Sequence, residues 1–182
     1  MPGIVARFVG GRAGWGGGMN INAKRAEFLV QQLNVLLVDD NAFTRKLVRG
    51  LLNNIGVKAI TEASDGIAAL EIIRQAPPDV IILDWEMPLL NGPELVRIVR
   101  SPGVFPAPDV PIIMLSGHGE RWRIVESVKL GVNEFLCKPV SAKALLERMI
   151  SILLKPRESV RFAGYYGPAP RLSKGLGDKP AA

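Results

Sequence analysis

The sequence has few of the features that mark secreted or membrane proteins. Its 182 residues include a single cysteine, Cys137, so no intramolecular disulfide can form, and we expect a small buried side chain there. Long hydrophobic runs are also lacking. The apolar segments that do occur are too short to span a bilayer; they lie at 35–38, 80–83, 111–115 and 145–154. The residues before Met19 contain no continuous apolar stretch, so the sequence does not predict a signal peptide. These absences predict a cytoplasmic protein without membrane insertion.

The excess of positive charge lies outside the middle of the chain. The net charge is +6, yet residues 33–155 contain 14 Lys+Arg and 14 Asp+Glu, so residues 1–32 and 156–182 share the excess. Neither tail has a dense Lys/Arg cluster, and no nucleic-acid-reading motif is recognisable, which argues against DNA binding. We interpret the tails as solubilising flanks, with binding of an acidic partner as the alternative.

The middle of the chain alternates five times between a short apolar run and an amphipathic helix. The apolar runs predict strands at 35–38, 57–63, 80–83, 111–115 and 134–138. Apolar residues at spacings of three and four predict helices at 42–55, 65–76, 94–100, 120–130 and 142–155. Asn41 and Ser141 are suited to cap the first and last of these helices. The alternation predicts an α/β fold: a five-stranded parallel sheet, doubly wound, with helices on both faces.

This pattern divides the chain into one domain, residues 33–155, and two extensions. The Gly-rich, basic residues 1–32 predict a flexible N-terminal extension. Because a glycine-rich segment precedes Met19, we hypothesise that translation begins at Met19. Residues 156–182 form a basic tail rich in glycine, proline and aromatic residues. Its aromatic side chains suggest docking on the domain or on a partner, with an inert extension as the alternative; they are Phe162, Tyr165 and Tyr166.

Polar side chains that could carry chemistry stand at the predicted strand ends. Asp39 and Asp40 follow the first strand, Asp84 the third, Ser116 the fourth and Lys138 the fifth. The carboxyl ends of parallel strands meet at one edge of the sheet, so we expect these side chains in one crevice. Three carboxylates in one place repel one another and need a cation, for which Mg²⁺, with its oxygen ligands, is the natural choice. A carboxylate in that setting can act as a nucleophile and form an aspartyl phosphate.

The same segments resemble a known family. VLLVDDN (35–41), VIILDWEMPLLNG (80–92), PIIMLSG (111–117) and EFLCKPV (134–140) resemble the receiver domains of bacterial two-component response regulators, the chemotaxis-regulator-like family. The resemblance covers about residues 34–155. It implies the flavodoxin-like (βα)5 receiver fold with strand order 2-1-3-4-5, and a domain that catalyses only its own phosphorylation and dephosphorylation.

The resemblance also implies a role for each site residue. Asp84 would be the phosphoacceptor, and Mg²⁺ would be held by Asp39, Asp40, Asp84 and the main-chain carbonyl of Glu86. Ser116 and Lys138 would contact the phosphoryl group. The Lys138–Pro139 peptide bond would be cis.

The implied switch couples the site to the surface of the domain. Ser116 would move toward the phosphoryl group, and Phe135 would turn inward behind it. The side chains of Glu86 and His118 would influence how long the phosphoryl group lasts. The donor would be a histidine kinase or histidine phosphotransfer protein, and the output a contact with a downstream protein. Trp122 is a candidate anchor for that contact, with inward packing as the alternative.

Other functions have less support from the sequence. Only 27 residues follow Lys155, too few for a helix-turn-helix output domain with its own core. A phosphorylation-independent scaffold is the main alternative, and the intact set of site residues argues against it. A flavodoxin-type nucleotide binder would need a Gly-rich phosphate loop after the first strand, which this sequence lacks.

Overall fold

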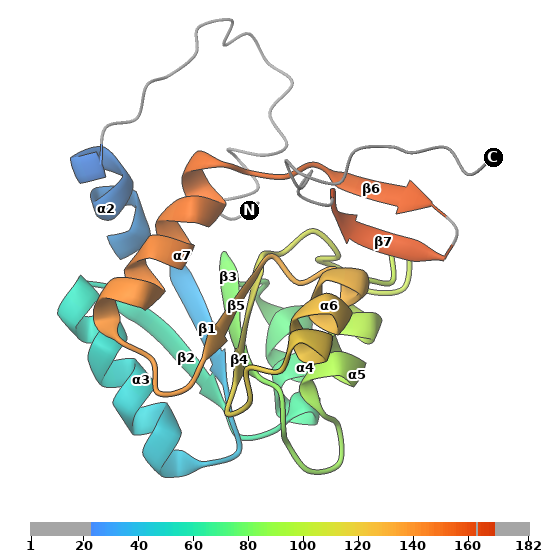
Figure 1. The fold of residues 1–182 in the computed structure, drawn as a ribbon, viewed down its shortest axis with the longest axis horizontal. Helices are drawn as coiled ribbons and strands as arrows, with labels where there is room; N and C mark the ends of the chain where they lie inside the picture. Colours follow the sequence, from blue (N-terminus) through green and yellow to red (C-terminus); the bar gives the residue numbers. More distant parts are fainter. Residues whose placement is uncertain (1–22, 163, 170–182) are drawn as a thin grey trace, which may run out of the picture.

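The described residues form a parallel sheet with helices on both faces (Figure 1). The computed structural model describes residues 23–162 and 164–169. The sheet contains β1 (Asn34–Val38), β2 (Ala59–Ala63), β3 (Val80–Asp84), β4 (Ile112–Ser116) and β5 (Glu134–Cys137), in the order β2-β1-β3-β4-β5. The connecting helices are α3 (Ala42–Ile55), α4 (Gly66–Gln75), α5 (Gly92–Val99), α6 (Arg121–Leu130) and α7 (Ala142–Leu154). The predicted fold class and strand order are confirmed.

Helix ends are set by local residues that the sequence singles out. The Asn41 side chain accepts hydrogen bonds from the amides of Phe43, at 2.9 Å, and Thr44, at 3.2 Å. At the other end of α3, Gly56 adopts φ +98°, a left-handed conformation that glycine takes without strain. Ser141 caps α7 by accepting from the amide of Ala144. These caps place the start of each helix directly after the strand end that carries the site.

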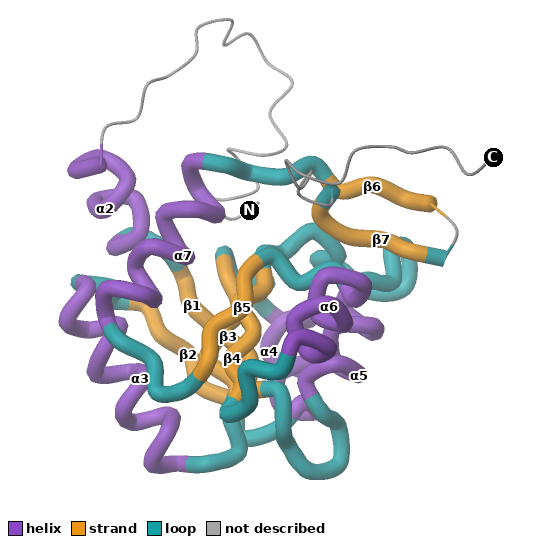
Figure 2. The backbone as a smooth tube through the Cα atoms, viewed as in Figure 1, coloured by secondary structure: helices purple, strands orange, loops and turns teal. Residues whose placement is uncertain are grey.

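Two apolar cores lie on opposite faces of the sheet, and Figures 1 and 2 show the helices that cover each face. Helices α3 and α7 cover one face, where Val48, Leu52 and Leu145 pack on the inward side chains of the strands. Helices α4, α5 and α6 cover the other, where Ile73 and Leu95 are prominent. Strands β3 and β4 are buried along their whole length, which explains their continuous apolar runs. No helix in the described residues is long and apolar enough to cross a membrane.

The structure differs from the predictions in the segment before β1. Residues Ala23–Gln31, expected to be flexible, form helix α2. Ala26 and Val30 are fully buried, and the Gln31 side chain donates a hydrogen bond to the carbonyl of Ile55 at 3.3 Å. Packing against α3 and α7 thus stabilises α2, which is too short to be recognised as a helix from its sequence pattern. The Met19 hypothesis lies outside the described residues.

The prediction of a buried cysteine is wrong. Cys137 is exposed, although it is the last residue of a strand. Successive side chains of a strand face opposite ways, so Leu136 packs into the core on the α3 and α7 side and Cys137 faces the other side of the sheet. Strand β5 is also the edge of the sheet and pairs on one side only, with β4, while the Cys137 sulfur lies close to Gly119 in the loop before α6.

The C-terminal segment forms a hairpin that docks on the domain. Strands β6 (Ser159–Phe162) and β7 (Tyr165–Pro168) pair antiparallel. The Tyr166 hydroxyl donates to Asp109 Oδ1 at 2.6 Å, and Arg157 Nη2 donates to the carbonyl of Asn133 at 2.6 Å. Asp109 and Asn133 precede β4 and β5, so the hairpin covers the amino ends of these strands (Figure 1). Of the alternatives for the aromatic cluster, docking on the domain is therefore the one observed.

Candidate functional site

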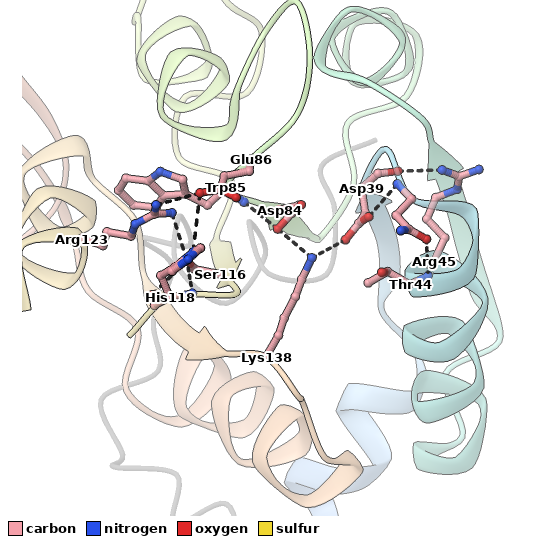
Figure 3. Close-up of polar contacts among 11 residues, drawn as sticks. Asp39, Thr44, Arg45, Asp84, Trp85, Glu86, Ser116, His118, Arg123 and Lys138 are labelled. Carbon is pink, nitrogen blue, oxygen red and sulfur yellow. Dashed lines mark hydrogen bonds and ion pairs between the residues drawn. The ribbon is translucent and has the colours of Figure 1, made fainter. Parts of the chain in front are cut away.

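Four charged side chains converge at the carboxyl edge of the sheet. Asp39 and Asp40 follow β1, Asp84 ends β3 and Lys138 follows β5. The ammonium of Lys138 lies 2.8 Å from both Asp39 Oδ2 and Asp84 Oδ1 (Figure 3). One carboxylate oxygen from each of Asp39, Asp40 and Asp84 lies within 4.8 Å of the other two. The sequence predicts this convergence for these four residues, and the structure has it.

Backbone groups hold two of the carboxylates in place. The Asp39 side chain accepts a hydrogen bond from the amide of Asn41 at 2.9 Å, and the Asp84 side chain accepts one from the amide of Trp85 at 2.9 Å. Gly92 passes so close to the end of β3 that a Cβ atom there would collide with the carbonyl oxygen of Asp84. The direction of the Asp84 side chain therefore depends on backbone packing as well as on Lys138.

Burial and charge act against each other in this pocket. Burial raises the pKa of Asp84 above its ordinary value, because the charged form loses hydration; the hydrogen bond and charge of Lys138 only partly offset this. Burial also disfavours the charged form of Lys138. Its hydrogen bonds to Asp39 and Asp84 outweigh that effect, so the pKa of Lys138 is raised and the amine stays protonated. The pocket therefore holds a fixed cation between two carboxylates.

The set of donors fits a divalent cation. With all three carboxylates ionised, the single charge of Lys138 leaves the pocket with an excess of two negative charges. Carboxylate oxygens are the ligands that Mg²⁺ prefers, and Asp40 is exposed, so an ion can reach the pocket from solvent. Asp39, Asp40 and Asp84 are the residues that would hold it.

Ser116 reaches the same edge of the sheet, but its hydroxyl is bonded within its own loop. Its Oγ donates to the carbonyl of His118 at 3.0 Å and accepts from the His118 amide at 3.1 Å. Arg123 Nη1 donates to it at 3.4 Å. The structure therefore does not bring the Ser116 hydroxyl into the group formed by Lys138 and the carboxylates.

Glu86 and His118 lie next to each other near the acidic pocket. His118 Nδ1 is 3.6 Å from Glu86 Oε1, and both side chains are about half exposed. The hydrogen bond from Arg123, 2.7 Å long, lowers the pKa of Glu86 below its ordinary value. His118 is thus a loop residue close to the site, as the sequence predicts.

An aromatic group lies behind the pocket. Phe135, on β5, is half-buried and packs edge-on against Trp85, with ring centroids 6.3 Å apart. Trp122, at the start of α6, also packs edge-on against Trp85, with ring centroids 5.9 Å apart, and is 54% exposed. Phe135 is therefore neither fully buried nor fully outward in this arrangement.

Two arginines at the site were not singled out from the sequence. Arg45, on α3, donates to the carbonyls of Asp39, at 2.7 Å, and Asp40, at 3.2 Å, and so holds the loop that carries both carboxylates. Arg123, on α6, contacts Glu86 and Ser116 together. Arg45 stands four residues after the capping Asn41, a position that could have indicated it. Nothing in the sequence around Arg123 separates it from the exposed arginine two residues earlier.

The comparisons with known proteins agree on one family. The response regulator receiver domain matches residues 35–150. The chemotaxis protein CheY1 of Helicobacter pylori is 34% identical over 122 residues, which cover 66% of this chain and 97% of that protein. CheY of Pseudomonas aeruginosa is 32% identical over 120 residues, covering 66% of this chain and 95% of that protein.

Solved structures give the same result. The chemotaxis response regulator CheY4 of Vibrio cholerae has a TM-score of 0.60 at 32% identity, covering 67% of this chain and 99% of that one. The receiver domain of the histidine kinase CKI1 from Arabidopsis thaliana, complexed with Mg²⁺ and BeF₃⁻, has a TM-score of 0.58 at 29% identity, covering 69% of this chain and 94% of that one. The chain belongs to the response regulator receiver domain family.

Proposed function

We propose that this protein is a phosphoaspartate switch that receives a phosphoryl group on Asp84 from a phosphohistidine donor. The observation that carries the proposal is the placement of Asp84. Its carboxylate is bonded to Lys138 on one side and lies among the oxygens of Asp39 and Asp40 on the other. A solvated strand-end carboxylate would have neither the fixed ammonium nor the neighbouring metal ligands.

The transfer reaction is a displacement at phosphorus. A carboxylate oxygen of Asp84 attacks the phosphorus of the phosphohistidine, forming a P–O bond as the P–N bond breaks. The departing imidazole nitrogen takes up a proton from solvent. The ammonium of Lys138, 2.8 Å from Asp84 Oδ1, is placed to compensate the negative charge of the transferred group.

Mg²⁺ is the cofactor that fits this chemistry. Asp39, Asp40, Asp84 and the main-chain carbonyl of Glu86 would hold it. When bound, the ion neutralises charge on the phosphoryl oxygens as it spreads during transfer. The complex of the CKI1 receiver with Mg²⁺ and BeF₃⁻ supports this assignment.

The output of the switch is a change of surface around α6. On phosphorylation, Ser116 turns toward the phosphoryl group and Phe135 turns inward, which favours one of two arrangements of α6 and β5. Apolar side chains on the outer face of α6 are open to a partner: Trp122, Val125 and Val128 are 54%, 44% and 44% exposed. The partner in this proposal is a downstream protein, bound through these side chains.

The donor and the location follow from the same chemistry. A histidine kinase, or a histidine phosphotransfer protein fed by one, supplies the phosphohistidine. A cytoplasmic location is part of the proposal, because such kinases draw on intracellular ATP. The similarity to chemotaxis proteins supports a role in signalling to a protein target.

Intact-mass spectrometry tests the proposal directly. The protein is incubated with acetyl phosphate and Mg²⁺, beside Asp84→Ala and the matched control Asp65→Asn, which alters an acidic residue at the start of α4. We expect one added phosphoryl group on the wild type and on Asp65→Asn, and none on Asp84→Ala or with Mg²⁺ chelated. A wild-type mass that stays unchanged with acetyl phosphate and with purified histidine kinases would refute the proposal.

A further inference from the structure

Arg123 is the one side chain of α6 that reaches from the helix into the phosphorylation site. Its Nη2 bonds to Glu86 Oε1 at 2.7 Å, and its Nη1 donates to Ser116 Oγ at 3.4 Å. The side chain is only 11% exposed although it belongs to a helix whose outer face is open. Figure 3 shows it between Trp85 and the loop that carries Ser116 and His118.

The guanidinium is fixed by aromatic rings as well as by hydrogen bonds. Its carbon lies 5.3 Å from the ring centre of Trp85 and 5.1 Å from that of Trp122, which is within the range of cation–π attraction. Trp85 directly follows Asp84, and Glu86 is the next residue along. Arg123 therefore connects α6 to the phosphoacceptor strand and to Ser116.

These contacts matter because Ser116 has no spare hydrogen-bonding capacity in this arrangement. A hydroxyl offers one donor and two acceptor positions. The Ser116 hydroxyl uses its donor for the carbonyl of His118 and its acceptor positions for the His118 amide and Arg123. Turning toward a phosphoryl group on Asp84 would remove these contacts, and little water can reach the buried guanidinium to replace the lost acceptor.

We propose that Arg123 is a positioning residue that holds Ser116 and Glu86 in the arrangement of the unphosphorylated protein and thereby lowers the readiness of Asp84 to accept a phosphoryl group. The proposal rests on the phosphoaspartate function stated above. Arg123 interacts more strongly with one of the two arrangements of Ser116, and only such a difference can shift their populations. The reactive arrangement is then a minor population, and the apparent affinity for a phosphoryl group falls in proportion.

The test compares Arg123→Gln with Arg121→Gln. Arg121 lies two residues earlier on α6, carries the same charge, is exposed and contacts no described residue through an ion pair or hydrogen bond. For each variant, intact-mass spectrometry gives the rate of phosphorylation by acetyl phosphate with Mg²⁺. The midpoint of a beryllofluoride titration, followed by tryptophan fluorescence, gives the apparent affinity of Asp84 for a phosphoryl mimic.

Arg123→Gln removes the hydrogen bonds to Ser116 and Glu86 and the ion pair with Glu120. Because the bond to Ser116 is made in only one of the two arrangements, its loss predicts a roughly three- to tenfold gain in both quantities. Arg121→Gln should behave as wild type. Arg123→Lys, which keeps the charge but cannot reach Ser116 and Glu86 together, should lie between wild type and Arg123→Gln. Urea unfolding of each variant establishes that the comparison is made on folded protein.

Repeating the comparison in a protein that lacks the Ser116 hydroxyl separates the positioning of Ser116 by Arg123 from a general effect of the Arg123→Gln substitution. Ser116→Ala removes the hydroxyl that Arg123 restrains, so adding Arg123→Gln should then change the beryllofluoride midpoint less than twofold. An equal gain in both backgrounds would overturn the proposal, as would no gain in either assay relative to Arg121→Gln. Absence of phosphorylation on wild-type Asp84 is a different result, which would refute the proposed function itself.

Discussion

Replacing Arg100 tests how the segments that precede β4 and β5 are held together. Arg100 follows α5 and is only 6% exposed. Its guanidinium donates to the carbonyls of Gly131, at 2.9 Å, and Pro108, at 2.6 Å, and to Asn133 Oδ1, at 3.1 Å. Burial lowers the pKa of Arg100 from its ordinary value to about 10, yet the group remains charged at neutral pH. One buried cation therefore serves three acceptors, of which Asn133 Oδ1 also accepts from the amide of Ile112.

We expect Arg100→Ala to lower the free energy of unfolding by about 3–5 kcal/mol at pH 7. An orphaned buried acceptor costs about 1–3 kcal/mol, and part of this is recovered because the desolvated charge is removed with the side chain. Arg97→Ala, on the preceding turn of the helix, is the control. Arg97 is 59% exposed and pairs with Glu126 only at 3.6 Å, so its loss should cost less than about 1 kcal/mol.

Urea unfolding monitored by circular dichroism measures both variants, and thermal unfolding should place the Tm of Arg100→Ala roughly 6–20 °C below wild type. Hydrogen exchange gives the location of the damage, which we expect in α6, the start of β5 and β7. A loss below about 1 kcal/mol, or equal losses for the two variants, would refute the argument that the carbonyls depend on this cation.

Three further perturbations have defined outcomes. Asp65→Ala should lower stability by about 1 kcal/mol at neutral pH through loss of the α4 cap. The cap hydrogen bonds lower the pKa of Asp65 below 3.8. The contribution of Asp65 to the free energy of unfolding is therefore complete above pH 3.8 and is lost as the pH falls through the lowered pKa. Urea titrations between pH 2.5 and 7 should show the stability of the wild type converging on that of the variant over this acid range. Gly92→Ala should cost about 1–3 kcal/mol and slow phosphorylation measured by intact mass, because the added methyl group meets the carbonyl of Asp84; a wild-type rate would count against this account. Tyr166→Phe should cost about 1 kcal/mol in urea and raise hydrogen exchange in β7, since the bond to Asp109 is lost; unchanged exchange would contradict it.

The strands and the acidic pocket could be predicted because their signals are local. Continuous apolar runs mark β3 and β4, which are buried on both faces, and Asp84 and Lys138 stand directly at strand ends. Asn41 and Gly56 bound α3 through contacts within a few residues. Each of these features can be predicted from neighbouring residues together with the rule that the functional site of a parallel sheet lies at the carboxyl ends of its strands.

The features that escaped prediction depend on distant partners. The hairpin is held by Tyr166 to Asp109 and by Arg157 to Asn133, and no periodicity in its own residues indicates either contact. Helix α2 is fixed by packing rather than by propensity. Arg123 finds its partner Glu86 in a loop 37 residues earlier in the chain. Sequence periodicity reports which face of an element is apolar but not which polar group lies opposite.

The position of the hairpin has a mechanical consequence for α6. Its C-terminal end is clamped: Gly131 lies against Gly167 of β7, and its carbonyl accepts the bond from Arg100. The N-terminal end, which carries Trp122 and Arg123, faces the acidic pocket and is held there by the side-chain contacts of Arg123 rather than by close backbone packing. A helix fastened at one end pivots rather than slides, so the largest displacement falls on its first turn. In this chain a small rotation of α6 about Gly131 would displace Trp122 the furthest, and the docked hairpin would fix the position of the pivot.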